Sequence, residues 1–344
     1  MSSACWKLDT EAASEALRLL RTARLVLIPT HQNVDADGLA SPLALMHALD
    51  QRGVRVQPLV SDGQLPTNLR FLPGVEKVLR YGEDELPEFD VLCMVDCSDR
   101  RRLGAFYSDD PSRVEGRYPI VNIDHHVTND EYGVINIVEP NAASASELVA
   151  DILALWGTEL TADIAQCLLA GIYGDTLGLR TEATTSRTMR TAADLVDAGA
   201  NPVPIVDALF RLKPRSSVCL WEHALRNVQW TGSLIWTELT EDTFKRCRAS
   251  RSEAEGMVNF LVGTEGSRAA AILYANEKGW RVSLRSLPSD VDVAAIASEF
   301  GGGGHPRAAG CDIHGGEEEK QAFLQRVAAL AAGDQEVPAR RRAT

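Results

Sequence analysis

Short apolar runs alternate with segments of helical periodicity through the first half of the chain. The apolar, β-favouring runs predict strands at residues 24–28, 54–60, 91–95, 120–123 and 134–138. Helical spacing of apolar residues predicts helices at 39–51, 145–156 and 162–173. This alternation is typical of a mostly parallel sheet flanked by helices. We therefore predict an α/β domain over residues 1–185.

The pattern changes twice further along the chain. Residues 186–230 have helical periodicity broken by glycine and prolines, which predicts a helical linker. From residue 231 a second α/β pattern begins, with strands expected at 234–238, 269–275 and 280–284 and helices at 294–300 and 320–331. We expect a smaller C-terminal domain over residues 231–333, followed by a disordered tail, 334–344.

Size and composition agree with two domains. A chain of 344 residues exceeds the length at which single cores usually stop growing, about 250–300 residues. No basic and apolar leader and no apolar run of about 20 residues is present, so we expect a cytoplasmic protein that does not span membranes. The seven cysteines form no CxxC pair and suggest buried thiols rather than a disulfide or zinc framework.

The net charge limits which kinds of molecule the protein is expected to bind. A formal net charge of −13 argues against a protein that coats long nucleic acids, which would need a basic face. A small anionic substrate is still compatible, because bound metal ions and a few arginines can reverse the field within one site.

The most informative motif is His31-Gln-Asn-Val-Asp35-Ala-Asp37-Gly38, which follows the apolar run 25–28. Groups after a buried strand lie where open α/β sheets place their active sites. A histidine and two aspartates suit a hard or borderline divalent cation. Alternatively, Asp37 caps a helix that starts near Leu39. This segment alone does not decide between the two interpretations.

Three further clusters follow predicted elements: Asp96-Cys-Ser98-Asp99, Asp124-His125-His126 and Asp175. Each alone has a simpler explanation, since Ser98 or Asp99 could cap a helix and Asp124 could start a turn. Their repetition favours one shared site, because parallel strands bring their carboxyl ends to the same edge of a sheet.

Together, these motifs offer more ligand atoms than one metal ion can bind. Two divalent ions about 3.5–4 Å apart would use them well. The first would be held by His31, Asp35 and Asp96, and the second by Asp37, Asp96, His125 and Asp175. Asp96 would bridge, because a carboxylate has two oxygens. A nitrogen and oxygen set without thiolate favours Mn²⁺, with Mg²⁺, Fe²⁺ or Co²⁺ as alternatives.

These motifs resemble, in order, the four motifs of the DHH phosphoesterases, and the segment 301–310, GGGGHPRAAG, resembles the signature of the accessory DHHA1 domain. The resemblance extends over nearly the whole chain. It implies the same metal ligands and places Asp124 and His126 beside the ions, with Asp96, Asp124 and His126 as the expected catalytic residues. One departure is Leu179, where the family more often has Phe before the arginine, here Arg180.

Substrate-binding residues are expected mainly in the C-terminal domain. Glycines allow positive φ and a close backbone approach, so their N–H groups could cradle a phosphate, although a flexible loop would look the same. Arg285 suits a terminal phosphate because a guanidinium can bind it bidentately, while the alternative is a surface arginine. The expected set is Arg180, Arg285, Ser286, Gly302, Gly303, Gly304 and His305.

The resemblance implies an enzyme that hydrolyses short oligoribonucleotides, 3′-phosphoadenosine 5′-phosphate (pAp), or both, with two Mn²⁺ ions activating water. A cyclic di-AMP or pApA phosphodiesterase of the same architecture is an alternative, and a non-catalytic nucleotide sensor is a second. The expected partners are therefore short RNA, a mononucleotide or a cyclic dinucleotide. The sequence is also compatible with a homodimer.

Overall fold

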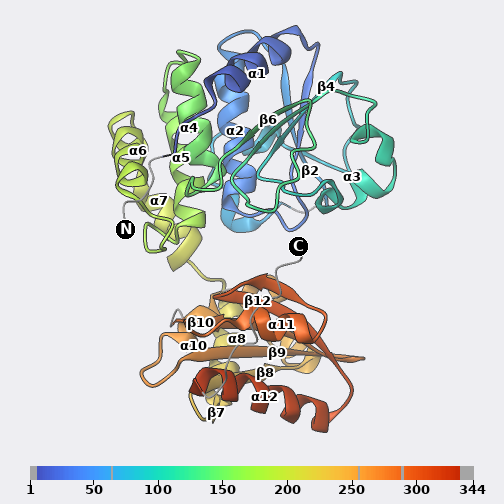
Figure 1. Ribbon diagram of the computed structural model, residues 1–344, viewed down its shortest axis with the longest axis vertical. Coiled ribbons are helices and arrows are strands. Elements are labelled where there is room, and N and C mark those ends of the chain that lie inside the picture. Colours follow the sequence, from blue (N-terminus) through green and yellow to red (C-terminus); the bar gives the residue numbers. More distant parts are fainter. Residues whose placement is uncertain (1–5, 63–64, 255, 288–289, 334–344) are drawn as a thin grey trace, which may run out of the picture. The chain divides into compact units, whose positions relative to one another are not determined.

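The computed structural model describes residues 6–62, 65–254, 256–287 and 290–333 (Figure 1). The chain forms two compact units, Met1–Leu212 and Lys213–Thr344. The segment 186–230, expected as a separate linker, is divided between them. The expected disordered tail, 334–344, and Cys5 lie outside the described residues.

Unit 1 contains a six-stranded sheet in the order β3-β2-β1-β4-β5-β6, with every neighbouring pair parallel. Its strands are β1 (Val26–Pro29), β2 (Val56–Val60), β3 (Leu79–Arg80), β4 (Val91–Val95), β5 (Ile120–Asp124) and β6 (Ile135–Val138). Parallel pairing confirms the predicted fold class. Strands β2 and β3 follow β1 on one side of the sheet. The chain then crosses back, and β4, β5 and β6 are added on the other side of β1. The carboxyl ends of β1 and β4 therefore flank a topological switch point, where such sheets bind ligands.

Both faces of this sheet are covered, which explains its continuous apolar runs. Val26 and Ile28 face a core formed with the helices, whereas Leu25 and Leu27 face the core that contains Leu103 and Phe106. The helices of the first face are α1 (Thr10–Thr22), α2 (Ala36–Asp50), α4 (Ala145–Leu155) and α5 (Ala162–Asp175), and α3 (Ala105–Ser108) lies on the second. The sequence pattern had not predicted α1.

Helix α2 begins earlier than predicted, at Ala36. Its N-cap is Asp35, whose Oδ1 accepts a hydrogen bond from the backbone N–H of Gly38 at 2.9 Å. The capping residue is thus Asp35 and not Asp37, so the capping interpretation of Asp37 was wrong for this helix.

The end of unit 1 is helical, as predicted. Helix α6 (Ser186–Asp197) is followed by α7 (Pro202–Val206) and a π-helical turn, Asp207–Arg211. Unit 2 begins with α8 (Arg215–Arg226), and Trp230, expected to be helical, lies in strand β7 (Gln229–Thr231).

Unit 2 contains a mixed sheet in the order β11-β12-β10-β9-β8-β7, in which only β8 and β9 pair in parallel. Its further strands are β8 (Leu234–Leu239), β9 (Ala269–Asn276), β10 (Gly279–Ser286), β11 (Gly303–His305) and β12 (Ala308–His314). One face packs on α11 (Val293–Glu299) and α12 (Glu317–Ala332), and the other on α8, α9 (Glu241–Cys247) and α10 (Met257–Val262).

The second half of the glycine run, Gly303 and Gly304, belongs to this sheet and not to a loop. Gly303–His305 forms β11, which pairs antiparallel with β12. A Cβ at Gly302 would collide with the carbonyl oxygen of Gly310, while a Cβ at Gly303 would meet nothing within 4 Å. Close packing of strands therefore explains at least Gly302, rather than close approach to a ligand.

The cysteine prediction was wrong for one pair. Cys219 of α8 and Cys247 of α9 form a disulfide, with their Cα atoms 5.5 Å apart. Packing of α8 against α9 brings together residues that are 28 positions apart in sequence. The other cysteines in the described part of the chain are buried and free, as predicted: Cys93, Cys97, Cys167 and Cys311. None of the described helices is long and apolar enough to cross a membrane.

Candidate metal centre

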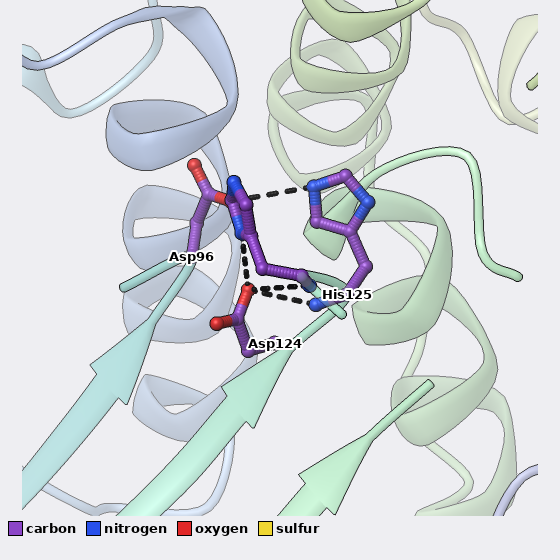
Figure 2. A group of neighbouring side chains, drawn as sticks. Asp96, Asp124 and His125 are labelled. Atoms are coloured by element: carbon purple, nitrogen blue, oxygen red, sulfur yellow. Dashed lines mark hydrogen bonds and ion pairs between the residues drawn. The ribbon is translucent and has the colours of Figure 1, made fainter. Parts of the chain in front are cut away.

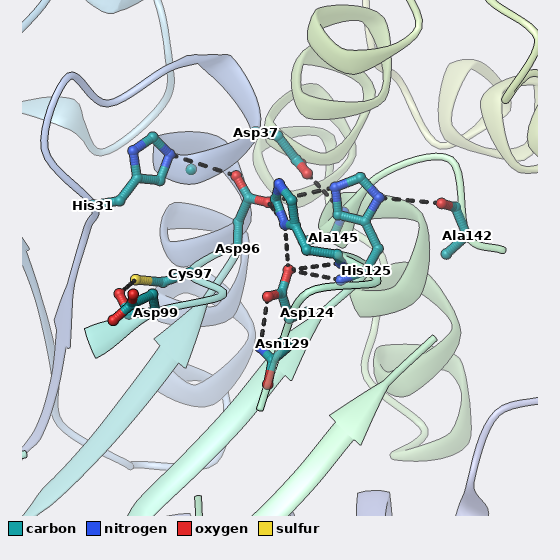
Figure 3. A network of polar contacts seen from close by, with 12 residues as sticks. His31, Asp37, Asp96, Cys97, Asp99, Asp124, His125, Asn129, Ala142 and Ala145 are labelled. Atoms are coloured by element: carbon teal, nitrogen blue, oxygen red, sulfur yellow. Dashed lines mark hydrogen bonds and ion pairs between the residues drawn. The ribbon is translucent and has the colours of Figure 1, made fainter. Parts of the chain in front are cut away.

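All six predicted metal ligands gather at the carboxyl edge of the unit 1 sheet, and four of them, His31, Asp37, Asp96 and His125, are labelled in Figure 3. They form overlapping groups whose donor atoms lie within 4.8 Å of one another: His31 with Asp35 and Asp96, Asp37 with His125 and Asp175, and Asp96 with Asp124, His125 and His126. The loops after β1, β4 and β5, the first turn of α2 and the end of α5 supply these side chains. The predicted convergence of strand ends is therefore present.

The first group contains His31, Asp35 and Asp96. His31 Nε2 lies 3.7 Å from Asp35 Oδ1 and 3.6 Å from Asp96 Oδ2. On the other side of the ring, His31 Nδ1 lies 2.9 Å from the carbonyl oxygen of Gln32, so Nδ1 carries a proton and donates it. In the neutral ring, the Nε2 lone pair is then available to an ion.

The second group repeats this arrangement. His125 Nε2 lies 3.1 Å from Asp175 Oδ2 and 3.5 Å from Asp96 Oδ1. His125 Nδ1 lies 3.2 Å from the carbonyl oxygen of Ala142, which again directs Nε2 towards the carboxylates. Asp96 thus presents one oxygen to each histidine, as a bridging ligand would (Figure 3). Figure 2 shows the side facing His125.

The residues fit a metal ion. The buried atoms without a hydrogen-bond partner include His31 Nε2, His125 Nε2 and Asp96 Oδ1. Buried polar atoms normally find partners, so three such atoms at one site indicate a missing ligand. Two ligands at about 2.1 Å from one ion lie roughly 3.0–3.7 Å apart, a spacing close to those between these histidines and carboxylates.

Asp37 has a second function that the sequence did not indicate. Its Oδ2 accepts a hydrogen bond from the backbone N–H of Ala145 at 2.6 Å, and its Oδ1 accepts one from Ser146 at 3.0 Å. Asp37 therefore binds the N-terminus of α4, where a negative charge is favoured. Each carboxylate oxygen keeps a further lone pair, so this contact is compatible with an ion.

Mutual interactions shift the pKa values of the site strongly. Burial disfavours the charged histidines, but neighbouring carboxylates prevail and raise the pKa of His31 to about 10 and that of His125 to about 12. Burial raises the pKa of Asp175 to about 6, aided by the charge of Asp96. Burial and the nearby Asp175 and Asp96 also raise the pKa of Asp37. For Asp96, the histidines outweigh burial and lower the pKa. The clustered carboxylates therefore make the site strongly negative when it holds no ion, and divalent ions would offset that charge.

The backbone at Asp96 is in the left-handed region, with φ of 57°. This conformation costs about 1–2 kcal/mol in a residue with a Cβ. It is held in place because the N–H of Asp96 donates to the carbonyl oxygen of Ile123 at 3.0 Å, which extends the pairing of β4 with β5. Strain of this kind is common where a side chain must be aimed at a functional site.

Asp124 and His126 lie beside the ligands. His126 Nδ1 is 2.7 Å from Asp124 Oδ1 and 3.5 Å from Asp96 Oδ1. Burial disfavours the charged His126 ring, but the hydrogen bond to Asp124 prevails and raises its pKa. Asp99 lies outside this group and accepts the backbone N–H of Arg101 at 2.9 Å. It is the N-cap of the short helix Arg100–Leu103.

The predicted substrate-binding residues are only partly brought together. Arg285 of β10 and His305 of β11 both pair with Ala308 of β12, so their side chains share one face of the unit 2 sheet. Ser286 faces the other side, is buried, and donates its hydroxyl to the carbonyl oxygen of Val291 at 2.7 Å. Arg180 belongs to unit 1, where its Nε donates to Leu177 and its guanidinium lies over the ring of Phe210.

Sequence reasoning missed a group of asparagines behind Asp124. Asn129 donates to Asp124 Oδ2 at 2.6 Å (Figure 3) and exchanges hydrogen bonds with Asn122 of β5. The available signal was Asn122, a polar residue in the middle of an otherwise apolar predicted strand.

Comparison with known proteins agrees with this geometry. Residues 25–172 match the N-terminal domain of the DHH family, and residues 243–333 match the DHHA1 domain. The bifunctional oligoribonuclease and PAP phosphatase NrnA of Thermus thermophilus is 34% identical over 298 residues, 84% of each chain. The Bacillus subtilis protein of the same name is 25% identical and covers 89% of this chain and 94% of that one.

Solved structures share the fold. An exopolyphosphatase-related protein from Bacteroides fragilis superposes with a TM-score of 0.86 at 22% identity, covering 95% of this chain and 99% of that one. RecJ from Thermus thermophilus, solved with Mn²⁺, has a TM-score of 0.57 at 17% identity and covers 96% of this chain and 56% of that one. On its motifs, its two matched domains and its relatives, the chain belongs to the DHH family of phosphoesterases and carries a DHHA1 domain.

Proposed function

We propose that this protein is a metal-dependent phosphoesterase that hydrolyses short oligoribonucleotides and pAp. The observation that carries the proposal is the set of converging donors with three orphaned atoms, His31 Nε2, His125 Nε2 and Asp96 Oδ1. The names of the Thermus and Bacillus relatives support the substrates, since both are described as acting on oligoribonucleotides and PAP.

The ions proposed are two Mn²⁺. His31, Asp35 and Asp96 would hold one, and Asp37, Asp96, His125 and Asp175 the other. The donor chemistry supports Mn²⁺, and RecJ of similar fold was solved with that ion. When bound, such ions act as Lewis acids and lower the pKa of a bound water.

The protein residues would orient the reaction. The hydrogen bonds from His31 to Gln32 and from His125 to Ala142 hold both rings so that Nε2 points into the site. His126, held by Asp124, would donate a hydrogen bond to a non-bridging phosphate oxygen and so favour the charge that develops there. Arg285 and His305 of unit 2 would bind another part of the nucleotide. A guanidinium and an imidazole on one sheet face suit a phosphate group.

A turnover panel tests this proposal. The purified protein would be assayed with Mn²⁺ on pAp, a ribodinucleotide, pApA, cyclic di-AMP and a long RNA, and Asp96→Asn would serve as the inactive control. Release of mononucleotide from the dinucleotide and of phosphate from pAp is the expected result. Faster turnover of cyclic di-AMP or pApA than of the other substrates would show that the protein is instead a phosphodiesterase for those dinucleotides. Binding of all four small nucleotides without turnover would favour the sensor alternative.

A further inference from the structure

Asp124 is completely buried, and hydrogen bonds reach its carboxylate from two sides. Its Oδ1 accepts from His126 Nδ1 at 2.7 Å and from the backbone N–H groups of His125 at 2.7 Å and His126 at 3.2 Å. Its Oδ2 accepts from Asn129 Nδ2 at 2.6 Å. One oxygen therefore orients the His125-His126 segment, while the other is held by a single side chain.

The orientation of the Asn129 amide is fixed by its neighbours. Its Oδ1 accepts from Asn122 Nδ2 at 2.9 Å and from the N–H of Glu131 at 2.8 Å, and its Nδ2 also donates to Asn122 Oδ1 at 3.2 Å. A rotation of 180° would place the amide oxygen against the Asp124 carboxylate and the amide nitrogen against a backbone donor. Only the observed orientation satisfies every group.

The network is anchored in the sheet. Asn122 of β5 and Asn136 of β6 are partners in the parallel pairing, and Asn122 Nδ2 donates to Asn136 Oδ1 at 3.0 Å. Asn136 in turn accepts the N–H of Gly133 at 2.9 Å and donates to its carbonyl oxygen at 2.8 Å. A continuous series of hydrogen bonds thus runs from the turn at Gly133 to Asp124.

Burying these polar side chains costs free energy that apolar side chains at the same positions would not cost. Asn122 is fully buried, and the residue that shares its face of β5, Ile120, belongs to an apolar core. Buried amides are tolerated only when all their groups are paired, and then they impose one arrangement. Here the arrangement ends at His126, whose ring is the one imidazole beside the metal ligands that the proposed metal sets do not use.

We propose that Asn129, held by Asn122 and Asn136, is a positioning residue that fixes Asp124 and, through it, the ring of His126. Because Asp124 accepts from the protonated Nδ1, Nε2 on the opposite side of the ring is the atom left to meet the substrate, and in the imidazolium form it carries the proton that a phosphate oxygen would accept. The expected effect on turnover rests on the proposed function, whereas the effect on the His126 ring does not.

The first test is kinetic. Asn129→Ala removes the donor, and Asn129→Asp keeps the size of the side chain but sets a second carboxylate against Asp124. Both variants should lower kcat on pAp or a dinucleotide by about 10- to 100-fold, with metal content unchanged. The matched control is Asn201→Ala, which removes the exposed N-cap of α7 and should leave kcat unchanged.

The second test does not need activity. In ¹⁵N NMR spectra of the full-length protein, the His126 Nδ1 of the wild type should have the shift of a nitrogen that donates to a carboxylate, and Asn129→Ala should move this signal towards that of a solvent-exposed imidazole. In the assay, His126→Ala combined with Asn129→Ala should be no slower than His126→Ala alone. Unchanged ring signals, or rate losses that multiply in the double variant, would overturn the inference. A wild type that turns over no substrate, with ring signals that still respond to Asn129→Ala, would refute the proposed function and leave the inference standing.

Discussion

His31 Nε2 and Asp96 Oδ2 lie 3.6 Å apart, and Nε2 has no hydrogen-bond partner among the residues that the structure describes. This spacing is too long for a hydrogen bond and is close to that of two ligands of one ion. Asp96 also faces His125 with its other oxygen, 3.5 Å from Nε2. The two halves of the site therefore depend on the same carboxylate.

Replacing Asp96 should abolish activity. Asp96→Ala removes the oxygen that faces each histidine, so both proposed ions lose a ligand and turnover should fall by about three orders of magnitude or more. Asp99→Ala is the control, since Asp99 caps a short helix and pairs with Arg101. It should cost about 0.5–2 kcal/mol of stability and little activity. Steady-state kinetics on pAp would check this, and equal losses in both variants would mean that the bridging ligand was misassigned.

Activity should depend on Mn²⁺. Chelation is expected to eliminate turnover, and added Mn²⁺ should restore it better than Ca²⁺, which prefers larger cages made entirely of oxygen ligands. Elemental analysis of the chelated and restored protein would be compared with its activity. Full turnover by protein that contains no bound metal would contradict the two-ion site.

Metal binding should release protons. Without an ion, the pKa of His31 is about 10 and that of His125 about 12, so both rings are protonated at pH 7. Because an ion needs the lone pair of Nε2, it must displace these protons, and its affinity should rise with pH by about tenfold per unit for each proton displaced. Calorimetric titration of chelated protein with Mn²⁺, in buffers of different ionisation enthalpy, measures this release. A binding heat that is the same in every buffer would contradict the protonated state of the rings.

We expect residues of unit 2 to affect mainly substrate binding and residues of unit 1 to affect the chemical step. Arg285→Ala and His305→Ala should raise KM for a dinucleotide by about tenfold or more, with some loss of kcat because remote binding energy helps to position the reacting phosphate. Hydrolysis of bis-p-nitrophenyl phosphate should change little. Arg281→Ala is a matched control, because Arg281 is on the same face of the same strand and is held by Asp312 at 3.0 Å, as Arg285 is held by Asn259 at 3.0 Å. Parallel losses on both substrates would place Arg285 and His305 in the chemical step.

The glycine run should respond to alanine in a position-dependent way. Gly302→Ala would force a Cβ against the backbone of β12, whereas Gly303→Ala meets open space. We expect a loss of about 1–3 kcal/mol for Gly302→Ala and close to none for Gly303→Ala, both measured by thermal unfolding. Equal stability of the two variants would mean that residue 302 does not lie against the backbone of β12 in solution.

The sequence allowed the gathering of these donor side chains to be predicted, because parallel strands bring their ends to one edge of the sheet. Asp96 and His125 follow strong apolar runs, so their meeting with His31 followed from topology alone. Strand β11 was not predicted, because glycines are depleted from strands and its pairing depends on the partner strand β12. The Cys219–Cys247 disulfide and the pairing of Asn122 with Asn136 depend on packing and register, which local patterns do not contain.

The contact of Asp37 with Ala145 has a practical consequence for dissecting the enzyme. Its carboxylate is both a proposed ligand and the acceptor for the first turn of α4, 108 residues further along the chain. Any substitution at position 37 would alter ion affinity and the docking of that helix together, so an inactive variant there could not be assigned to either cause. Asp35, whose side chain is 58% exposed, caps α2 through Gly38, so Asp35→Asn, which keeps a capping oxygen but removes the charge, is the cleaner substitution for weakening half of the site.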